Sequence, residues 1–399
     1  MPVTTKDIPE AARALHFSAL VIDGHADTPQ RMLDDRYDLG APLSGGHLNL
    51  ASAREGGLGA EFFIAWVDPR RFPGQFARRT LDLIESVRAA VAAHPMETML
   101  ATCADDIERA HREGKLAMLL GVEGGHSIEG SLDRLREYHR LGVRYMTLTW
   151  ANSNGWGDSS GDVDDLTVPH TEDGLTAFGE NVIREMNRLG MMVDLSHVAD
   201  RTFWRVLEAS RAPVFASHSS ARALTNSPRN LTDEMLRAVA SRGGVVMVNF
   251  YSAFISERWQ QQWHALRPEL QTAHEAQAAE CATANIPLTY ERITALDRLF
   301  ASRVPRPPLS DLIDHIEHIA RVAGIDHVGL GSDFDGMPSL PEEIDSAADL
   351  PKITAALMER GFSEDDCRKI LGLNFLRFFR EVQTTAEKLQ AERPGVAAE

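Results

Sequence analysis

The chain has 399 residues, enough for one large domain or two ordinary ones, and its 43% hydrophobic and 25% charged residues are typical of a soluble globular protein. The formal charge of −17, from 41 basic and 58 acidic residues, argues against nucleic acid and anionic membrane surfaces as partners. The first 17 residues are charged and lack the apolar core of a secretory signal, and no apolar run is long enough to span a membrane. Three widely spaced cysteines predict reduced thiols in a cytoplasmic protein: Cys103, Cys281 and Cys367.

Eight short apolar runs are typical of strands that are buried on both faces. Helical patterns lie between most of them, and Asp200 and Thr232 are expected to be helix N-caps. Strands that alternate with helices in this way predict an α/β fold, a (β/α)8 TIM-like barrel. The predicted strands are 19–23, 60–67, 116–122, 145–149, 191–195, 214–216, 244–250 and 327–331, and the predicted helices are 76–94, 131–141, 174–189, 200–209, 232–241 and 309–323.

We expect a single barrel domain over residues 1–385 and a disordered tail over residues 386–399. A polar insertion, residues 252–308, follows the seventh predicted strand and carries Trp259, Trp263 and Gln-rich helical stretches. We interpret this insertion as a lid or as a subunit contact, and a subunit contact would make the protein a homodimer.

The residues that follow the first strand are the most informative of the chain. His25 and Asp27 are two positions apart, so their side chains can face the same way at a strand end. An imidazole and a carboxylate are both ligands of a divalent metal such as zinc. A histidine near an aspartate is more often a plain hydrogen-bonded pair, so the metal interpretation depends on whether similar segments recur.

Similar polar residues end four further strands, namely Glu123, His197, His218 and Asp333. In a (β/α)8 barrel all of these lie at the C-terminal end, where the catalytic residues of this fold are found. Each has another explanation on its own, such as a buried histidine, a helix-capping glutamate or an aspartate in a turn, but five coincidences are much less expected. Three carboxylates and three histidines match two metal ions better than one. His126, close to Glu123, is expected to be structural.

With these motifs the chain resembles the membrane (renal) dipeptidases, the M19 metallopeptidases within the amidohydrolase-like superfamily. The resemblance runs from about Asp23 to Arg377. The matching segments are Asp23-Gly-His-Ala-Asp27, Gly121-Val-Glu-Gly-Gly-His-Ser127, Arg144-Tyr-Met-Thr-Leu-Thr149, Asp194-Leu-Ser-His197, Ala216-Ser-His-Ser-Ser220, Ser227-Pro-Arg-Asn230, Val246-Met-Val-Asn-Phe-Tyr251, Gly331-Ser-Asp-Phe-Asp-Gly336 and Leu371-Gly-Leu-Asn-Phe-Leu-Arg377.

The resemblance implies a binuclear zinc metallo-dipeptidase of the membrane dipeptidase type, with two Zn²⁺ per chain. His25 and Asp27 would bind one ion, His197 and His218 would bind the other, and Glu123 would bridge them. Two metal ions lower the pKa of a water molecule between them, which makes hydroxide available near neutral pH.

The resemblance also implies roles on the substrate side. Asp333 would be the catalytic residue that takes the proton from the nucleophile and passes it to the leaving amine. Arg229 would bind the free carboxylate of a small dipeptide, because a planar guanidinium suits that bidentate contact. Tyr251, which ends another matching segment, is a further candidate for binding substrate.

One position departs from the family pattern. Well-known members carry a histidine directly after the strand-four Thr-Leu-Thr, where it is thought to help hold the carbonyl oxygen, and here that position is Trp150. An indole offers one neutral donor, so we expect Trp150 to shape the pocket and Asn152 or Asn154 to supply the missing contact. Two alternatives stay open. The same barrel could hydrolyse an N-acyl amino acid or a lactone, or the chain could be an inactive binding protein, whose sequence would have lost a metal ligand.

Overall fold

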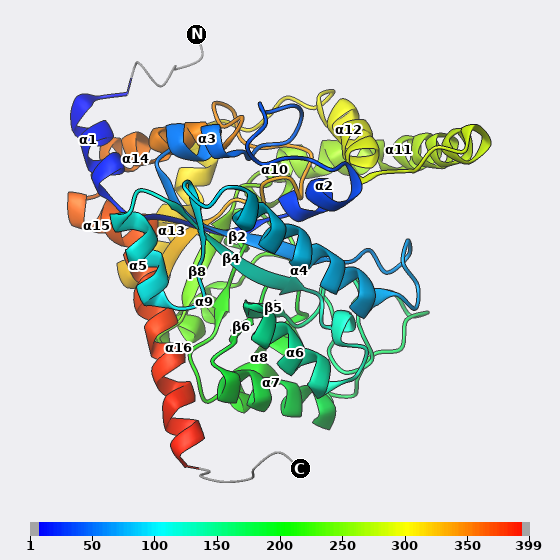
Figure 1. Cartoon of the computed structure of the whole chain (residues 1–399), viewed down its shortest axis with the longest axis horizontal. Helices are drawn as coiled ribbons and strands as arrows, with labels where there is room; N and C mark the ends of the chain where they lie inside the picture. The colour runs from blue at the N-terminus through cyan, green and yellow to red at the C-terminus, as the bar shows by residue number, and fades with distance from the viewer. Residues whose placement is uncertain (1–7, 393–399) are drawn as a thin grey trace.

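Nine parallel strands form one sheet in the computed structural model, which describes residues 8–392 (Figure 1). The order is β2-β1-β9-β8-β7-β6-β5-β4-β3, and the additional pairing of β2 with β4 closes eight of the strands into a barrel. The predicted (β/α)8 TIM-like barrel is therefore confirmed. The barrel strands are β1 (Val21–Ala26), β2 (Leu58–Trp66), β4 (Leu116–Glu123), β5 (Val143–Thr147), β6 (Met192–Asp194), β7 (Phe215–Ala216), β8 (Val245–Asn249) and β9 (Val328–Gly331).

The ninth strand, β3 (Thr98–Leu100), lies outside the closed barrel and was not expected from the sequence. It pairs with Leu116 to Met118 at the start of β4, before the stretch of β4 that pairs with β5. Met99 and Leu100 of this edge strand are only half-buried, so the rule for strands buried on both faces does not cover it.

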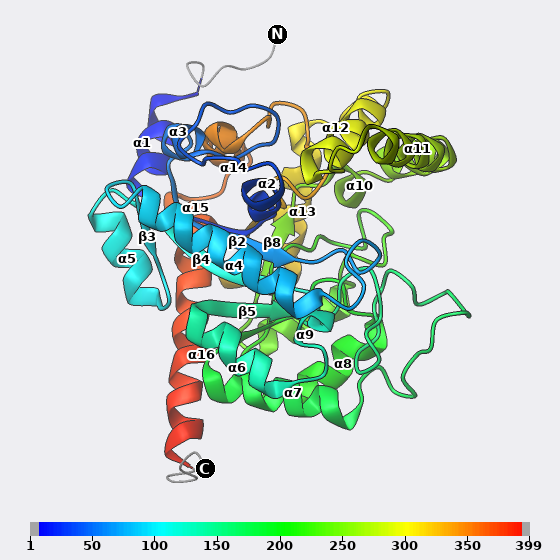
Figure 2. The same ribbon diagram turned by 45° about the vertical axis from the view of Figure 1, so that its right-hand side comes forward.

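The helices cover the outside of the barrel, and α4, α6 and α7 lie next to one another there (Figures 1 and 2). Thr232 caps α9 as expected, because its side chain accepts a hydrogen bond from the Met235 N–H. The expected cap at Asp200 is wrong, since Ala199 is the N-cap and Asp200 is the first helical residue, where its charge favours the positive helix end. The predicted helices appear as α4 (Phe76–Ala93), α6 (Leu132–Leu141), α7 (Ala177–Leu189), α8 (Asp200–Ala209), α9 (Asp233–Ser241) and α13 (Leu309–Ala323).

The N-terminal end of the barrel is closed by aromatic side chains of α16 (Asn374–Ala391). The ring of Phe375 lies 5.5 Å from that of Phe62 on β2, and the ring of Phe378 lies 5.1 Å from that of Phe215 on β7. Burial of such large rings stabilises this end of the barrel. The polar residues on the inner surface of the barrel lie at its opposite, C-terminal end.

The insertion 252–308 forms three helices, and α11 extends away from the barrel (Figure 1). Trp259 and Trp263 stack with 5.4 Å between ring centroids and anchor the base of α11. Residues 386–391 of the predicted disordered tail are helical, because α16 continues to Ala391, and residues 393–399 lie outside the described part of the chain. The other helices are α1 (Glu10–Ser18), α2 (Thr28–Asp34), α3 (Leu50–Glu55), α5 (Ala104–Arg112), α10 (Ser252–Ile255), α11 (Glu257–Ala284), α12 (Tyr290–Ala301), α14 (Leu350–Glu359) and α15 (Glu364–Arg368).

Within residues 8–392, no helix has both the length and the apolar character needed to cross a bilayer. The three cysteines are free thiols, as expected, with Cys281 and Cys367 buried and Cys103 half-buried.

Candidate metal centre

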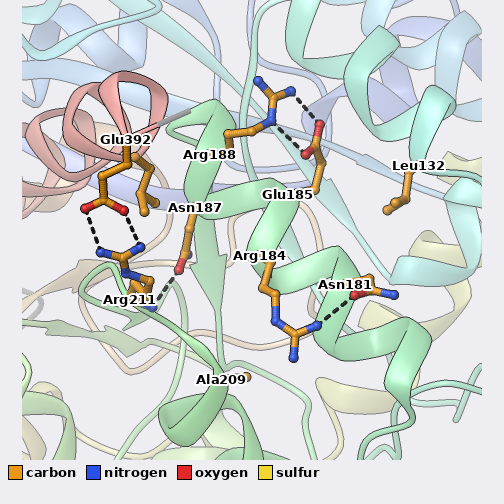
Figure 3. Close-up of a pocket in the computed structure, with 10 residues that line it drawn as sticks. Leu132, Asn181, Arg184, Glu185, Asn187, Arg188, Ala209, Arg211 and Glu392 are labelled. Carbon is orange, nitrogen blue, oxygen red and sulfur yellow. Dashed lines mark hydrogen bonds and ion pairs between the residues drawn. The ribbon is translucent and has the colours of Figure 1, made fainter. Parts of the chain in front are cut away.

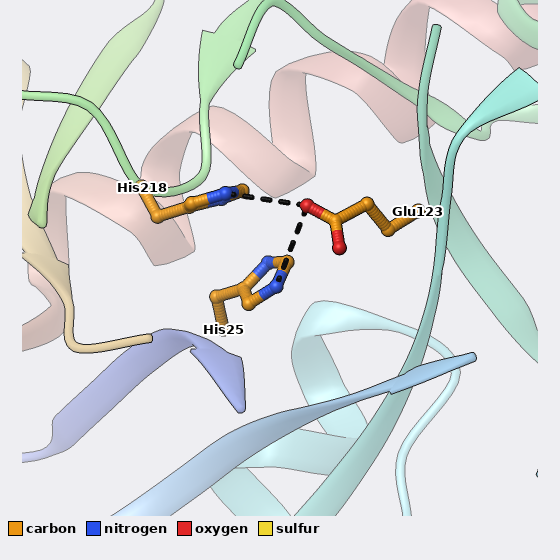
Figure 4. Close-up of side chains that lie close together, drawn as sticks. All are labelled: His25, Glu123 and His218. Atoms are coloured by element: carbon orange, nitrogen blue, oxygen red, sulfur yellow. Dashed lines mark ion pairs between the residues drawn. The ribbon is translucent and has the colours of Figure 1, made fainter. Parts of the chain in front are cut away.

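The C-terminal ends of the barrel strands bring the five predicted metal ligands together. Glu123 ends β4, His25 lies near the end of β1 with Asp27 just after it, and His197 and His218 follow β6 and β7. The Glu123 Oε1 atom lies 2.8 Å from His197 Nε2, 3.4 Å from His218 Nε2 and 3.8 Å from His25 Nε2. Figure 4 shows His25 and His218 reaching the same carboxylate oxygen. One oxygen that faces three imidazoles has the position of a bridging ligand.

Two sets of three ligand atoms each lie within 4.8 Å of one another. One set is His25, Glu123 and His218, and the other is His25, Asp27 and Asp333. Among residues 8–392, the buried atoms His25 Nε2 and Asp27 Oδ1 have no hydrogen-bond partner. Buried polar atoms are nearly always paired, and imidazole nitrogen with carboxylate oxygen is a donor set that suits zinc. The residues present therefore fit divalent metal ions.

Buried acidic and basic groups of the centre shift one another's pKa values. Burial raises the pKa of Glu123 well above its usual value, and the charges of Asp27 and Asp333 raise it further. Burial also raises the pKa of Asp333 to about 6. For His25 burial lowers the pKa, but the Glu123 and Asp27 carboxylates outweigh this effect and raise it to about 9. A divalent cation at this position would neutralise the same charges.

A chain of hydrogen bonds orients His218. Burial lowers its pKa well below 6.5, so the ring is neutral, which is the form that binds metal. The ring Nδ1 lies 2.7 Å from Ser217 Oγ, and this hydroxyl donates to Asp194 Oδ2 at 2.6 Å. The imidazole therefore donates from Nδ1 and leaves Nε2 without a proton, facing His197 Nε2 at 3.0 Å and Glu123 Oε1 at 3.4 Å. Partners of metal-binding histidines commonly hold the ring in this way.

His25 has a different partner. Its Nδ1 lies 2.9 Å from the Tyr145 hydroxyl oxygen, and that hydroxyl donates to the Gly24 carbonyl at 3.1 Å. Because the tyrosine proton is used on Gly24, the hydroxyl oxygen accepts from His25 Nδ1–H. Neither Tyr145 nor Asp194 was predicted to have a role, although both lie in the segments that carry the family resemblance.

Asp333 lies two residues after the end of β9, beside the proposed metal ligands. Its backbone φ of 62° is in the left-handed region, and its N–H donates to the His25 carbonyl at 3.0 Å. Asn249, the last residue of β8, donates from Nδ2 to Asp333 Oδ2 at 3.1 Å. Asn249 was not among the predicted site residues, but the strand-end rule that predicts the metal ligands also applies to it.

Arg229 lies next to His218 and is 9% exposed. Its guanidinium donates to the His218 carbonyl at 3.1 Å and to Ser219 Oγ at 3.3 Å, and it lies 5.1 Å from the ring centre of Phe254. Within the described chain the buried Nε atom has no hydrogen-bond partner. A buried guanidinium with an unused donor at the mouth of the barrel is suited to an anionic group.

Trp150 lies at the mouth of the barrel, after β5. Its ring is 6.5 Å from the ring of His197 and 4.7 Å from that of Trp66. The side chain is half-buried, and its backbone carbonyl accepts a hydrogen bond from Ser159 Oγ. The indole therefore lies beside His197, one of the proposed metal ligands.

The two asparagines after Trp150 differ in the hydrogen bonds that their side chains already make. Asn154 is tied to its own loop, because its Oδ1 accepts from the Gly157 N–H at 3.0 Å and its Nδ2 donates to the Leu148 carbonyl at 2.8 Å. Asn152 Oδ1 is buried and has no hydrogen-bond partner in the described part of the chain. Asn152 is therefore the better placed of the two to contact a ligand.

Two further predicted residues lie at the edge of the centre. The ring of Tyr251 packs 4.9 Å from Phe254 and 5.6 Å from Trp259, within the apolar cluster of the insertion. His126 bonds the Val67 carbonyl through Nε2 at 2.8 Å, which agrees with its expected structural role.

A separate cavity of about 550 Å³ lies outside the barrel, between α7 and the end of α16 (Figure 3). Arg188 contacts Glu185 at 2.6 and 2.8 Å, and Arg211 contacts Glu392 at 2.8 and 3.0 Å. Arg184, the third arginine of the cavity, is paired with Glu180, so carboxylates neutralise all three guanidinium groups and the cavity is poorly suited to an anion. The candidate functional site is therefore the group of side chains at the mouth of the barrel and not this outer cavity.

Comparison with known proteins identifies the family. The family description "Membrane dipeptidase (Peptidase family M19)" matches residues 9–393. The chain belongs to this family of metallopeptidases. This membership confirms the resemblance seen in the sequence.

Solved structures of dipeptidases share the fold. The probable dipeptidase PvdM from Pseudomonas aeruginosa has a TM-score of 0.80 at 24% identity, over 96% of this chain and 100% of that chain. Dipeptidase AC, a family M19 metallopeptidase, has a TM-score of 0.73 at 26% identity, over 91% and 98%. A metallopeptidase from Rhodobacter sphaeroides, liganded with a phosphinate mimic of the dipeptide L-Ala-D-Ala, has a TM-score of 0.72 at 25% identity, over 91% and 99%.

Proposed function

We propose that the protein is a zinc-dependent dipeptidase that holds two metal ions at the mouth of its barrel. The observation that carries this proposal is the Glu123 Oε1 atom, which lies 2.8 to 3.8 Å from three imidazole nitrogens. His25 and Asp27 would hold one ion, and His197 and His218 the other. When bound, the ions supply an activated water near neutral pH and polarise the scissile carbonyl.

The residues around the centre fit the remaining steps of peptide hydrolysis. Asp333, held by Asn249, is placed to take a proton at its carboxylate from the attacking water and to return it to the leaving amine. Arg229 would bind the carboxylate of the dipeptide with its unused Nε donor, which fixes the peptide bond relative to the centre. These two roles account for a substrate that is short and has a free C-terminus.

The second candidate function is hydrolysis of an N-acyl amino acid or a lactone by the same barrel. The observation that favours it is the half-buried Trp150 ring, an uncharged group 6.5 Å from the His197 ring. The test is a panel of dipeptides, N-acyl amino acids and lactones with the zinc-loaded protein. Our proposal predicts that kcat/KM is highest for dipeptides, and a higher kcat/KM for acylated amino acids or lactones contradicts it.

The oligomeric state is a separate prediction. If the insertion with α11 is a subunit contact, the protein should have the mass of a homodimer in light scattering. If it acts as a lid, a monomer is expected.

A further inference from the structure

The barrel places the polar groups for the substrate on one side of its mouth. In the sheet order, β7, β8 and β9 are neighbours, and β2, β4 and β5 lie across the barrel from them. Arg229 follows β7, Asn249 ends β8 and Asp333 follows β9. The carboxylate of a dipeptide would therefore lie on the β7–β9 side. Its N-terminal residue would extend across the centre toward β2 and β5.

Trp66, the last residue of β2, faces the centre from this second side. In the parallel pairing of β2 with β4, Trp66 is the register partner of Glu123. Paired residues of neighbouring strands present their side chains on the same face of the sheet, and the Glu123 carboxylate faces the metal centre. Trp66 also packs against the cluster that fills the barrel, which includes Ile64 and Phe62, two and four residues before it. The indole therefore lies on the inner side, at the level of Glu123.

Three aromatic rings meet there, and we call Trp66, Trp150 and Tyr290 the aromatic wall. The Trp66 ring is 4.7 Å from that of Trp150 and 6.4 Å from that of Tyr290. Trp66 and Trp150 are both half-buried. Tyr290 comes from α12 of the insertion, and its hydroxyl donates to the Asp335 carbonyl at 2.8 Å, which fixes the ring. The wall thus joins β2, the loop after β5 and the insertion.

We propose that the aromatic wall binds the side chain of the N-terminal residue and makes the enzyme prefer dipeptides with a large apolar first residue. This inference rests on the proposed dipeptidase function. Aromatic rings bind apolar and aromatic side chains through burial and edge or stacked contacts. The indoles carry no formal charge, so the wall offers an acidic or basic side chain no ion-pair partner. A first residue such as leucine or phenylalanine fits this surface, and glycine leaves it uncovered.

The experiment compares kcat/KM of the zinc-loaded protein for Gly-Gly, Leu-Gly and Phe-Gly. The natural protein should favour Leu-Gly and Phe-Gly over Gly-Gly by at least about tenfold, the range that apolar pockets reach. Trp66→Ala should reduce this ratio about tenfold, and Trp66→Phe should keep most of it, because the ring surface remains. Trp204→Ala on α8, where Trp204 packs 5.0 Å from Phe203, is the matched control and should leave the ratio unchanged.

A second readout measures binding without turnover. The calorimetric affinity of a phosphinate mimic of Phe-Gly, relative to the mimic of Gly-Gly, should fall in Trp66→Ala by the same factor as the kinetic ratio. If Trp66→Ala does not fold, Trp150→Leu is tested in the same series with the same expectation.

Three results would overturn the inference. The first is an equal loss for Gly-Gly and Phe-Gly in Trp66→Ala, and the second is a loss in Trp66→Phe as large as in Trp66→Ala. The third is hydrolysis by the natural protein with no preference at the first residue, which leaves the proposed dipeptidase function standing. A protein that hydrolyses no dipeptide contradicts both the proposed function and this inference.

Discussion

Asp194→Asn should weaken metal binding through His218, although Asp194 itself contacts no proposed ligand ring. The Asp194 carboxylate is fully buried and accepts four hydrogen bonds. Its Oδ1 accepts from the N–H groups of Ser196 and Ser217 at 3.0 and 2.9 Å, and its Oδ2 accepts from the hydroxyls of Ser217 and Thr147 at 2.6 and 2.7 Å. The Ser217 hydroxyl in turn contacts His218 Nδ1. The charge of Asp194 thus supports the imidazole through one hydroxyl.

The magnitude follows from what asparagine changes. The amide oxygen can keep the two N–H contacts, but the amide nitrogen cannot accept from the two hydroxyls, and the negative charge is lost. Loss of such a supporting group typically costs about 10–100-fold in metal affinity, which corresponds to about 1.4–2.7 kcal/mol. Hydrogen bonds to a charged group are each worth about 1.5–3 kcal/mol, so the metal-free protein should lose stability as well.

The assay is a zinc titration of metal-free protein in competition with a chromophoric chelator, together with the unfolding midpoint of the same sample. Thr147→Val is the matched control, because it removes one hydroxyl from Asp194 and leaves the chain from Asp194 through Ser217 to His218 intact. This control should lower the midpoint and change zinc affinity less than about threefold. Unchanged zinc affinity in Asp194→Asn, or an equal loss of affinity in Thr147→Val, would refute the reasoning.

Three other changes give independent tests. Asp333→Asn should retain metal and lose about 10²–10⁴-fold in kcat, and a loss under about tenfold reassigns the proton-handling role. Arg229→Met should raise KM for a dipeptide much more than for its C-terminal amide, and an equal rise for both contradicts carboxylate binding. Burial raises the pKa of Glu61 well above 4.5 and that of its strand neighbour Asp23 to about 6, so this pair contributes most to folding at low pH and loses that contribution as pH rises through 6. Metal-free Glu61→Gln should therefore lose less stability than the natural protein between pH 5 and 8, and parallel pH profiles of the unfolding midpoint would exclude this account.

The barrel could be predicted because its strands are buried on both faces and appear as continuous apolar runs. The candidate ligands could be predicted for a related reason. Polar residues directly after such runs, such as Glu123 and His218, lie at one end of any parallel barrel whatever the loops do. Strand β3 was missed because it lies at the edge of the sheet and is half-buried, unlike the barrel strands.

Contacts between side chains could not be predicted from the sequence and are known only from the structure. Asp194 pairs with Phe215 of the next strand, and this pairing brings Ser217 and His218, which follow that strand, beside Asp194. Trp66 ends a predicted apolar strand and resembles a core residue in the sequence, and only its register with Glu123 places it beside the centre. Likewise, the sequence does not distinguish Asn152 from Asn154, since the difference lies in the loop bonds that Asn154 makes.

Metal analysis of the purified protein tests the central claim most directly. The account predicts close to two zinc-like ions per chain, loss of dipeptide hydrolysis when a chelator removes them, and recovery when zinc is returned. His218→Ala should reduce the metal content toward one ion, because it removes one of the two histidines proposed for the second ion. Full hydrolysis of dipeptides by protein shown to be free of metal would contradict the account.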